Sequence, residues 1–197
     1  EQVHLVARLD GGGLDALELN VSSPNMKDGG MLFGCSKAAT HEVTKAVKAV
    51  STVPVFVKLS PNVTDIVAIA KAVEDGGADG IAMINTLLGM AIDVNTRRPI
   101  LGNITGGLSG PAIKPVALAL TWKVAQAVGI PIVGMGGITT WRDAVEFLIA
   151  GATAIQVGTA TFVNPQAGPE ILDGLTSYCQ GRDIDNINDL IGSLQTT

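Results

Sequence analysis

Polar residues or glycines stand at or just after the end of each of five short apolar runs in this 197-residue chain. They are Asn20, Lys58, Asn85 with Thr86, Gly136 with Gly137, and Gly158 with Thr159. An asparagine amide donates and accepts hydrogen bonds at once, which suits a flat heterocycle that alternates C=O and N–H groups. Paired glycines let a phosphate approach free backbone N–H groups closely. These residue types therefore predict a site for a flat polar ring and a phosphate.

A structural role is an alternative for each of these residues taken alone. The glycine pairs can serve only as tight turns, and each asparagine can serve as a turn or capping residue. Lys58 ends a run that is otherwise apolar, so its ammonium group must find an anion, a catalytic role or a route to water. His4 and His41 stand away from the ends of the runs. We therefore expect neither a metal site nor a histidine-based catalytic triad.

The five apolar runs are predicted to be β-strands buried on both faces, because most of them lack polar-apolar alternation. They cover residues 16–21, 53–59, 80–85, 130–134 and 152–158. Apolar residues at helical spacing fill the intervals between them. The expected helices begin at Thr40, span residues 64–76 and span residues 140–151. Asp143, three residues after Thr140, predicts a capping box at the start of the last helix.

The alternation of strands and helices predicts an α/β fold with a parallel sheet, either an open doubly wound sheet or a (β/α)₈ TIM barrel. A complete barrel needs eight strands and about 250 residues. A barrel here would therefore contain only about the last five β/α units. No linker interrupts residues 1–197, which are expected to form a single domain. The connection from Thr86 to Ser109 is longer than the usual loop after a strand, which is typical of a binding loop or lid.

Charge and composition narrow the function classes. The formal net charge is −5 and the 13 Lys and Arg residues are dispersed, which disfavours a nucleic-acid partner. No apolar run reaches the ~18 residues of a membrane span, and the first residues lack the layout of a secretory signal. Cys35 and Cys179 are too few for a disulfide framework, which favours a cytoplasmic location. Because the sequence begins at Glu1 rather than Met, we expect a fragment or a processed product.

Six segments carry a specific pattern in the same order along the chain. They are residues 18–34 (ELNVSSPNMKDGGMLFG), 57–61 (VKLSP), 85–86 (NT), 105–115 (TGGLSGPAIKP), 134–138 (GMGGI) and 156–160 (QVGTA). Together they resemble the dihydroorotate dehydrogenase family, particularly its NAD-linked class 1B catalytic subunits. The resemblance covers nearly the whole chain.

The resemblance implies an FMN-binding TIM barrel of which this chain is the C-terminal part. The implied reaction is the oxidation of (S)-dihydroorotate to orotate in de novo pyrimidine (UMP) biosynthesis, with the hydride passing to FMN. The residues implied to bind FMN are Asn20, Lys58, Ile84, Gly110, Gly136, Gly137, Gly158 and Thr159, the last four at its phosphate. The residues implied to bind the substrate are Asn20, Asn25, Asn85 and Thr86.

Ser23 is implied to be the catalytic base, because it stands where class 1 members of the family have a cysteine. Serine is the base in the membrane-linked class 2 enzymes, yet the surrounding residues resemble class 1B. A thiol with a pKa of about 8.5 is partly ionised at neutral pH, whereas a serine hydroxyl needs a relay to pass the proton on. Ser23 is thus an impaired base or a base that works through water. A substitute role for Cys35 is an alternative to a merely structural one.

The resemblance also implies partners. These are dihydroorotate and orotate as ligands, an electron-transfer subunit that carries FAD and a 2Fe–2S cluster, and further copies in an oligomer. Two other functions are left open by the residues. One is a phosphate-binding aldolase or isomerase without redox chemistry, in which Lys58 forms a Schiff base or acts electrostatically. The other is an inactive partial barrel, because an unclosed barrel leaves strand edges with unpaired backbone groups.

Overall fold

A parallel sheet of five strands, in the order β1-β2-β3-β8-β9, forms the centre of the computed structural model, which describes residues 2–9, 12–22 and 34–196. The strands are β1 (Leu17–Asn20), β2 (Val55–Leu59), β3 (Gly80–Met83), β8 (Ile132–Met135) and β9 (Ala154–Gln156). Every neighbouring pair is parallel. Each strand lies at one of the five predicted positions, so the prediction of an α/β fold with a parallel sheet is confirmed.

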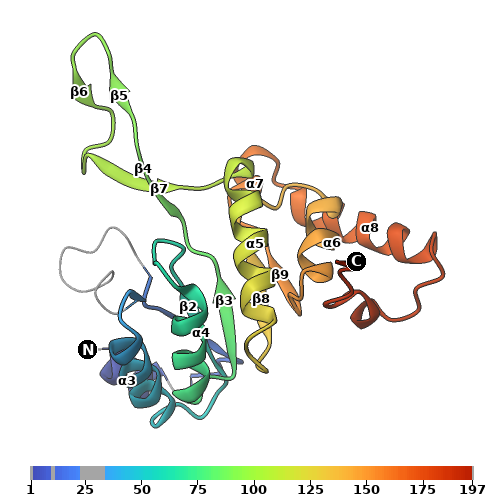
Figure 1. The fold of residues 1–197 in the computed structure, drawn as a ribbon, viewed down its shortest axis with the longest axis horizontal. Helices are drawn as coiled ribbons and strands as arrows, with labels where there is room; N and C mark the ends of the chain where they lie inside the picture. Colours follow the sequence, from blue (N-terminus) through green and yellow to red (C-terminus); the bar gives the residue numbers. More distant parts are fainter. Residues whose placement is uncertain (1, 10–11, 23–33, 197) are drawn as a thin grey trace.

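Helices connect these strands. They are α1 (Gln2–Leu9), α3 (Lys37–Lys48), α4 (Ile66–Asp75), α5 (Lys114–Ala125), α6 (Trp141–Ile149), α7 (Ala160–Val163) and α8 (Ala167–Gln180), with short 3₁₀ turns η1 (Pro111–Ile113) and η2 (Ile187–Leu190). Helices α3 and α4 pack beside β2 and β3, and α5 and α6 pack beside β8 and β9 (Figure 1). Within the described ranges, no helix has the length and apolar character needed to cross a membrane.

The order of the strands distinguishes the two architectures considered for the sheet. In a doubly wound sheet the order reverses at a switch point, which puts helices on both faces. Here the order follows the chain from one edge to the other without reversal. Because crossovers between parallel strands are right-handed, successive helices then lie on the same face. This is the arrangement of a barrel wall.

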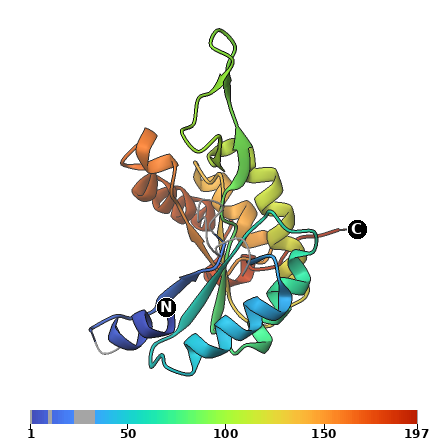
Figure 2. The same ribbon diagram turned by 90° about the vertical axis from the view of Figure 1, so that its left-hand side faces the viewer.

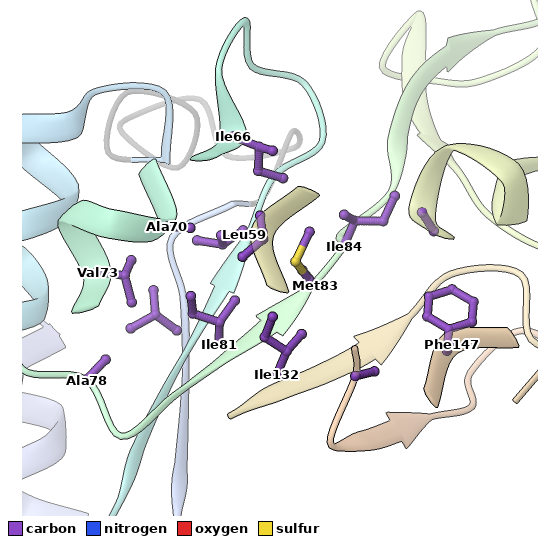
Figure 3. Packing of buried hydrophobic residues seen from close by; sticks show 14 of the residues in the cluster. Leu59, Ile66, Ala70, Val73, Ala78, Ile81, Met83, Ile84, Ile132 and Phe147 are labelled. Carbon is purple, nitrogen blue, oxygen red and sulfur yellow. The ribbon is translucent and has the colours of Figure 1, made fainter. Parts of the chain in front are cut away.

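Alternate residues of each strand point to opposite faces of this sheet. On the outer face, which packs against the helices, Val57, Leu59, Ile81 and Met83 are fully buried. They form one cluster with helix residues such as Phe147 (Figure 3). A Cβ added at Gly134 would lie 2.7 Å from the Phe147 ring, so β8 and α6 approach each other closely there.

The inner face of the sheet carries a different set of side chains. Register places Glu18 beside Phe56, and Asn20 beside Lys58. Register continues from Lys58 through Ala82 and Val133 to Ala154. Gln156 is two residues from Ala154, so its exposed side chain lies on the same face. This face is therefore partly polar and partly open to solvent.

The helix boundaries test three sequence predictions. The capping box of α6 is confirmed, because Thr140 Oγ1 accepts from the Asp143 N–H and Asp143 Oδ2 accepts from the Thr140 N–H. Helix α4 ends at Gly76 as predicted, but Asp65 rather than Thr64 caps its start. The predicted start of α3 at Thr40 is wrong, because Ser36 caps the helix. Serine caps as well as threonine, and the residues that follow it, Lys-Ala-Ala, favour a helix.

The long connection after β3 forms two antiparallel ribbons. Strand β4 (Leu87–Met90) pairs with β7 (Thr105–Leu108), and β5 (Ile92–Asp93) pairs with β6 (Arg98–Pro99). The ribbons project away from the five-stranded sheet (Figures 1 and 2). The unusual length of this connection was predicted, but its strands were not, because glycines within them weaken the strand pattern. A role as a lid stays a prediction.

Candidate active site

A cavity of about 230 Å³ lies at the carboxyl ends of β2, β3, β8 and β9. Its lining includes many of the residues predicted from the resemblance: Lys58, Ile84, Asn85, Thr86, Gly110, Gly136, Gly137, Gly158 and Thr159. These residues are far apart in the chain, but parallel pairing brings the strand ends to one edge of the sheet. The structure therefore gathers most of the predicted site around one cavity, while the role of each residue stays a prediction.

Two backbone segments meet at the glycine-rich end of the cavity. A Cβ added at Gly137 would lie 2.8 Å from both Gly110 O and Lys114 N, and the backbone of Gly137 has φ of +77°. Only glycine avoids both the clash and the strained left-handed conformation. At Gly158, by contrast, an added Cβ would meet nothing within 4 Å. The glycines thus provide close packing behind the cavity and open space within it.

Unpaired backbone donors surround this glycine-rich end. Across the part of the chain that the structure describes, the N–H groups of Gly136, Gly137, Gly158 and Thr159 donate to no protein acceptor. Thr159 Oγ1 donates to Ser109 Oγ at 2.9 Å, which links two sides of the cavity. Gly136 and Gly137 are partly exposed and Gly158 and Thr159 are exposed, so these unpaired N–H groups are accessible to a ligand that supplies acceptor atoms. A phosphate group supplies several acceptor oxygens of the kind that these donors suit.

Asparagine and serine side chains form a hydrogen-bonded cluster at the ends of β1 and β3. Asn20 Oδ1 accepts from the Ser22 N–H at 3.1 Å and from Ser22 Oγ at 3.0 Å. Asn85 Nδ2 donates to Ser22 Oγ at 2.8 Å and reaches Asn20 Oδ1 at 3.5 Å. Asn85 Oδ1 accepts from the Thr86 N–H at 2.8 Å. The predicted substrate amides are therefore held in place by one another and by Ser22.

Ser22 was missed as a functional residue by the sequence reasoning. Its side chain is fully buried and touches both asparagines. Asn20 itself does not line the cavity but lies next to Asn85, which does. The signal for Ser22 was present in its position directly after the strand, but a serine there is more often a turn residue.

Lys58 is the one charged side chain among the described residues that line the cavity. Its Nζ lies 3.1 Å from Glu18 Oε1, and its side chain is 19% exposed. Of the three outcomes expected for this lysine, an anion, a catalytic role or a route to water, the structure shows an anion, which the neighbouring strand supplies. No group of three or more His, Cys, Asp or Glu side chains among the described residues is arranged to hold a metal ion.

Further polar residues line or support the cavity although the sequence did not single them out. Gln156 and Thr139 are part of the lining. Asn62 donates from Nδ2 to Thr86 O at 2.9 Å and accepts from the Leu88 N–H at 2.9 Å. Gln156 stands inside the predicted strand 152–158 and is the last residue only of the shorter β9, whereas the contacts of Asn62 depend on a loop conformation that spacing does not reveal.

Ser23 and Asn25 lie outside the described residues. Cys35 is exposed, and its thiol donates to Asn62 O at 3.7 Å. Both the structural role and the substitute role of Cys35 stay predictions.

An ion-paired cluster lies behind the glycine-rich end. Lys114 Nζ lies 2.6 Å from Asp143 Oδ1 and 2.8 Å from Glu146 Oε2. Burial alone would raise the pKa of Asp143, but hydrogen bonds from Lys114, Thr139 and Thr140 outweigh it and hold the pKa well below its ordinary value. The hydrogen bonds to Asp143 and Glu146 raise the pKa of Lys114 despite its partial burial. Asp143 and Lys114 therefore both carry their charges at neutral pH.

Comparison with known proteins links this geometry to one family. The family model described as dihydroorotate dehydrogenase matches residues 1–178. The chain is 58% identical, over 98% of its length, to the dihydroorotate dehydrogenase B (NAD(+)) catalytic subunit of Desulforamulus reducens. It is 57% identical, over 95% of its length, to the protein of the same name from Alkaliphilus oremlandii.

A solved structure is similar in fold. It is the DHODH of Eimeria tenella in complex with ferulenol, with a TM-score of 0.81 and 25% sequence identity over 97% of this chain. The match covers 56% of that chain, and this chain spans 64% and 62% of the two bacterial relatives. The matched region is therefore less than two thirds of each of these proteins.

Proposed function

The chain belongs to the dihydroorotate dehydrogenase family, and we propose that it carries the active-site cavity of an enzyme that oxidises (S)-dihydroorotate to orotate in de novo pyrimidine biosynthesis. One observation carries the proposal: residues that the family resemblance singles out line a single cavity, with unpaired N–H groups on the β8–β9 side and amides on the β3 side. The activity is proposed for the complete gene product that contains these 197 residues.

The family is flavin-dependent, and the flavin proposed here is FMN. The cavity fits this group on two counts. The unpaired N–H groups of Gly136, Gly137, Gly158 and Thr159 suit a terminal phosphate, and the open space at Gly158 leaves room for it. When bound, FMN supplies the hydride acceptor that no amino-acid side chain provides.

The proposed roles of the other residues follow from their positions. Lys58, at the end of β2, contacts the flavin ring while Glu18 restrains its side chain. Asn20, Asn85 and Thr86, with Asn25, hold the substrate ring and its carboxylate. Because the hydrogen bonds to Ser22 fix the asparagine side chains before substrate arrives, they reduce the entropic cost of orienting the ring.

Ser23 is the proposed catalytic base. Oxidation of the ring removes a hydride from one carbon and a proton from its neighbour, and the Ser23 hydroxyl accepts that proton and passes it on through water. A serine hydroxyl is a weaker base than a thiolate at neutral pH. We therefore expect Ser23→Ala to lower the rate of flavin reduction by about 10²- to 10⁴-fold. Ser23→Cys is expected to retain activity.

The relatives are named catalytic subunits, so they work with at least one further subunit. We extend this to a proposed electron-transfer subunit that carries FAD and a 2Fe–2S cluster, and to an oligomeric enzyme in the cytoplasm. An aldolase or isomerase is disfavoured by the family match. Lys58 Nζ is also held 3.1 Å from Glu18 Oε1, so a Schiff base at this lysine would require that contact to break.

Anaerobic mixing with dihydroorotate tests the proposal. The complete gene product, loaded with FMN, is expected to lose its visible flavin absorbance when (S)-dihydroorotate is added, and orotate is expected to appear in equal amount. Ser23→Ala should bind the same amount of FMN but bleach far more slowly. A protein that takes up no FMN, or that keeps its flavin oxidised under dihydroorotate, would contradict the proposed function.

A further inference from the structure

Asp143 has more hydrogen bonds than the cap of one helix requires. Its Oδ2 accepts from the N–H and the hydroxyl of Thr139, at 2.9 and 3.0 Å, and from the N–H and the hydroxyl of Thr140, at 2.8 and 2.9 Å. Its Oδ1 accepts from Lys114 Nζ at 2.6 Å. The residue is 8% exposed. Asp143 therefore fixes the backbone directly after the Gly136–Gly137 pair, where Thr139 lines the cavity.

Lys114 connects this loop to the other wall of the cavity. It is the first residue of α5 and follows the segment 109–113, in which Ser109, Gly110 and Ile113 line the cavity. Its backbone N lies within 2.8 Å of the place that a Cβ of Gly137 would occupy. One residue thus contacts the glycine loop with its main chain and Asp143 with its side chain.

We propose that Lys114 and Asp143 are positioning residues that set the separation between the two backbone walls of the phosphate end of the cavity, an inference that rests on the proposed function. The walls are residues 109–114 and 136–140. Phosphate binding by backbone donors requires each N–H to lie within hydrogen-bond distance of a shared group, so the spacing of the walls controls how many donors act together. Neither Lys114 nor Asp143 is among the described residues that line the cavity.

A purely structural role for the pair is the competing explanation. The capping box of α6 needs only Thr140 and Asp143. Lys114 takes no part in that box, although it bridges to Asp143 across 29 positions of sequence. Removing the ammonium group therefore leaves the helix cap in place and releases the link between the walls, which separates the two roles.

Binding of FMN and of riboflavin by Lys114→Met provides the test. Riboflavin has the same ring system but no phosphate. In the complete gene product, titrated by flavin fluorescence, we expect Lys114→Met to bind FMN about tenfold more weakly, the equivalent of one charge-assisted hydrogen bond. Its affinity for riboflavin should equal that of the unsubstituted protein. Lys114→Arg, which keeps the ion pair, should recover most of the FMN affinity.

Lys48→Met is the matched control. Lys48 pairs with Asp79, and its side chain is 32% exposed, compared with 25% for Lys114. Asp79 also accepts from the Val55 N–H at the start of β2. This is the amino end of the strand, whereas the cavity lies at the carboxyl ends of the strands. Loss of this pair should lower the melting temperature without changing the ratio of FMN to riboflavin affinity.

The outcomes separate this inference from the proposed function. If the unsubstituted protein binds FMN no more tightly than riboflavin, the phosphate site is wrong and the inference falls with it. If it prefers FMN and Lys114→Met keeps that preference in full, the inference alone is wrong. The inference would also be overturned if Lys114→Met lost affinity for FMN and for riboflavin by the same factor. If Lys114→Met fails to fold, the same two titrations are carried out with Asp143→Asn. This variant keeps an acceptor oxygen for the α6 cap.

Discussion

The two faces of the five-stranded sheet differ in almost every property. On the outer face, Val57, Leu59 and Met83 are apolar, fully buried and packed against helices of this chain. On the inner face, Glu18 and Lys58 form a salt bridge with side chains that are 36% and 19% exposed. Burial of apolar side chains supplies the folding free energy. The outer face therefore stabilises the fold, whereas the inner face and the strand ends beside it provide the chemistry.

This division explains why polar residues are tolerated at the ends of apolar strands. Successive side chains of a strand point to opposite faces, so a polar residue on the inner face can stand between two residues of the buried cluster. Lys58 lies between Val57 and Leu59, both fully buried, yet its own side chain points to the opposite face. A substitution on one face is thus expected to change either stability or ligand binding, but not both.

Of the substitutions that test the difference between the two faces, Leu59→Ala is expected to have the largest effect, a loss of stability. The side chain is fully buried on the outer face, and removing such a side chain typically lowers the free energy of unfolding by about 2 to 5 kcal/mol. Urea denaturation of the complete gene product measures it. Gln156→Ala, on the inner face, is the control and should stay within about 0.5 kcal/mol. Equal losses from both substitutions would contradict the division of roles between the faces.

Gly137→Ala tests whether the strand ends bind the ligand. The residue needs φ of +77°, and its new Cβ would lie 2.8 Å from Gly110 O and Lys114 N. The left-handed conformation costs about 1 to 2 kcal/mol for an alanine. The clash also has to move the cavity wall. We expect the affinity for FMN to fall by more than about tenfold, since at least one phosphate hydrogen bond is lost.

Gly192→Ala separates conformational strain from the effect on the cavity. Gly192 also has a positive φ, of +68°, but an added Cβ meets nothing within 4 Å. It should lower the melting temperature through strain alone and leave FMN affinity unchanged. If Gly137→Ala and Gly192→Ala bind FMN with equal affinity, the glycine loop does not contribute to phosphate binding.

The pH dependence of stability gives the smallest expected effect. The folded-state pKa of Asp143 is depressed, so its contribution to stability is complete above the unfolded pKa of about 3.9 and is lost as the pH falls through the folded value. The difference in melting temperature between the unsubstituted protein and Asp143→Asn should therefore be constant from about pH 5 to 8 and narrow below about pH 4. Asp173→Asn, on the exposed surface of α8, is the control.

Local patterns in the sequence predicted the elements of this fold better than the contacts between them. Apolar runs located all five strands of the sheet, and the spacing of Thr140 and Asp143 predicted a capping box. The start of α3 was misplaced because Ser36 and Thr40 are both good caps. When two good capping residues lie one helical turn apart, packing decides where the helix begins.

The sequence did not predict the contacts in the site between residues that are far apart in the chain. Lys58 and Glu18 are 40 positions apart, and Asn85 and Ser22 are 63 apart. Their pairing depends on the register between strands and on loop conformation, which spacing along one chain does not specify. The convergence of the strand ends was predictable, because parallel βαβ units bring their carboxyl ends to one edge. Which side chains then satisfy one another was not.

A crystal structure of the complete gene product with FMN tests the central claim most directly. We expect one FMN in the cavity at the ends of β2, β3, β8 and β9, with its phosphate accepting from the N–H groups of Gly137 and Gly158 and its ring next to Lys58. An FMN bound elsewhere, or one whose phosphate faces Asn85 while its ring faces the glycines, would contradict it.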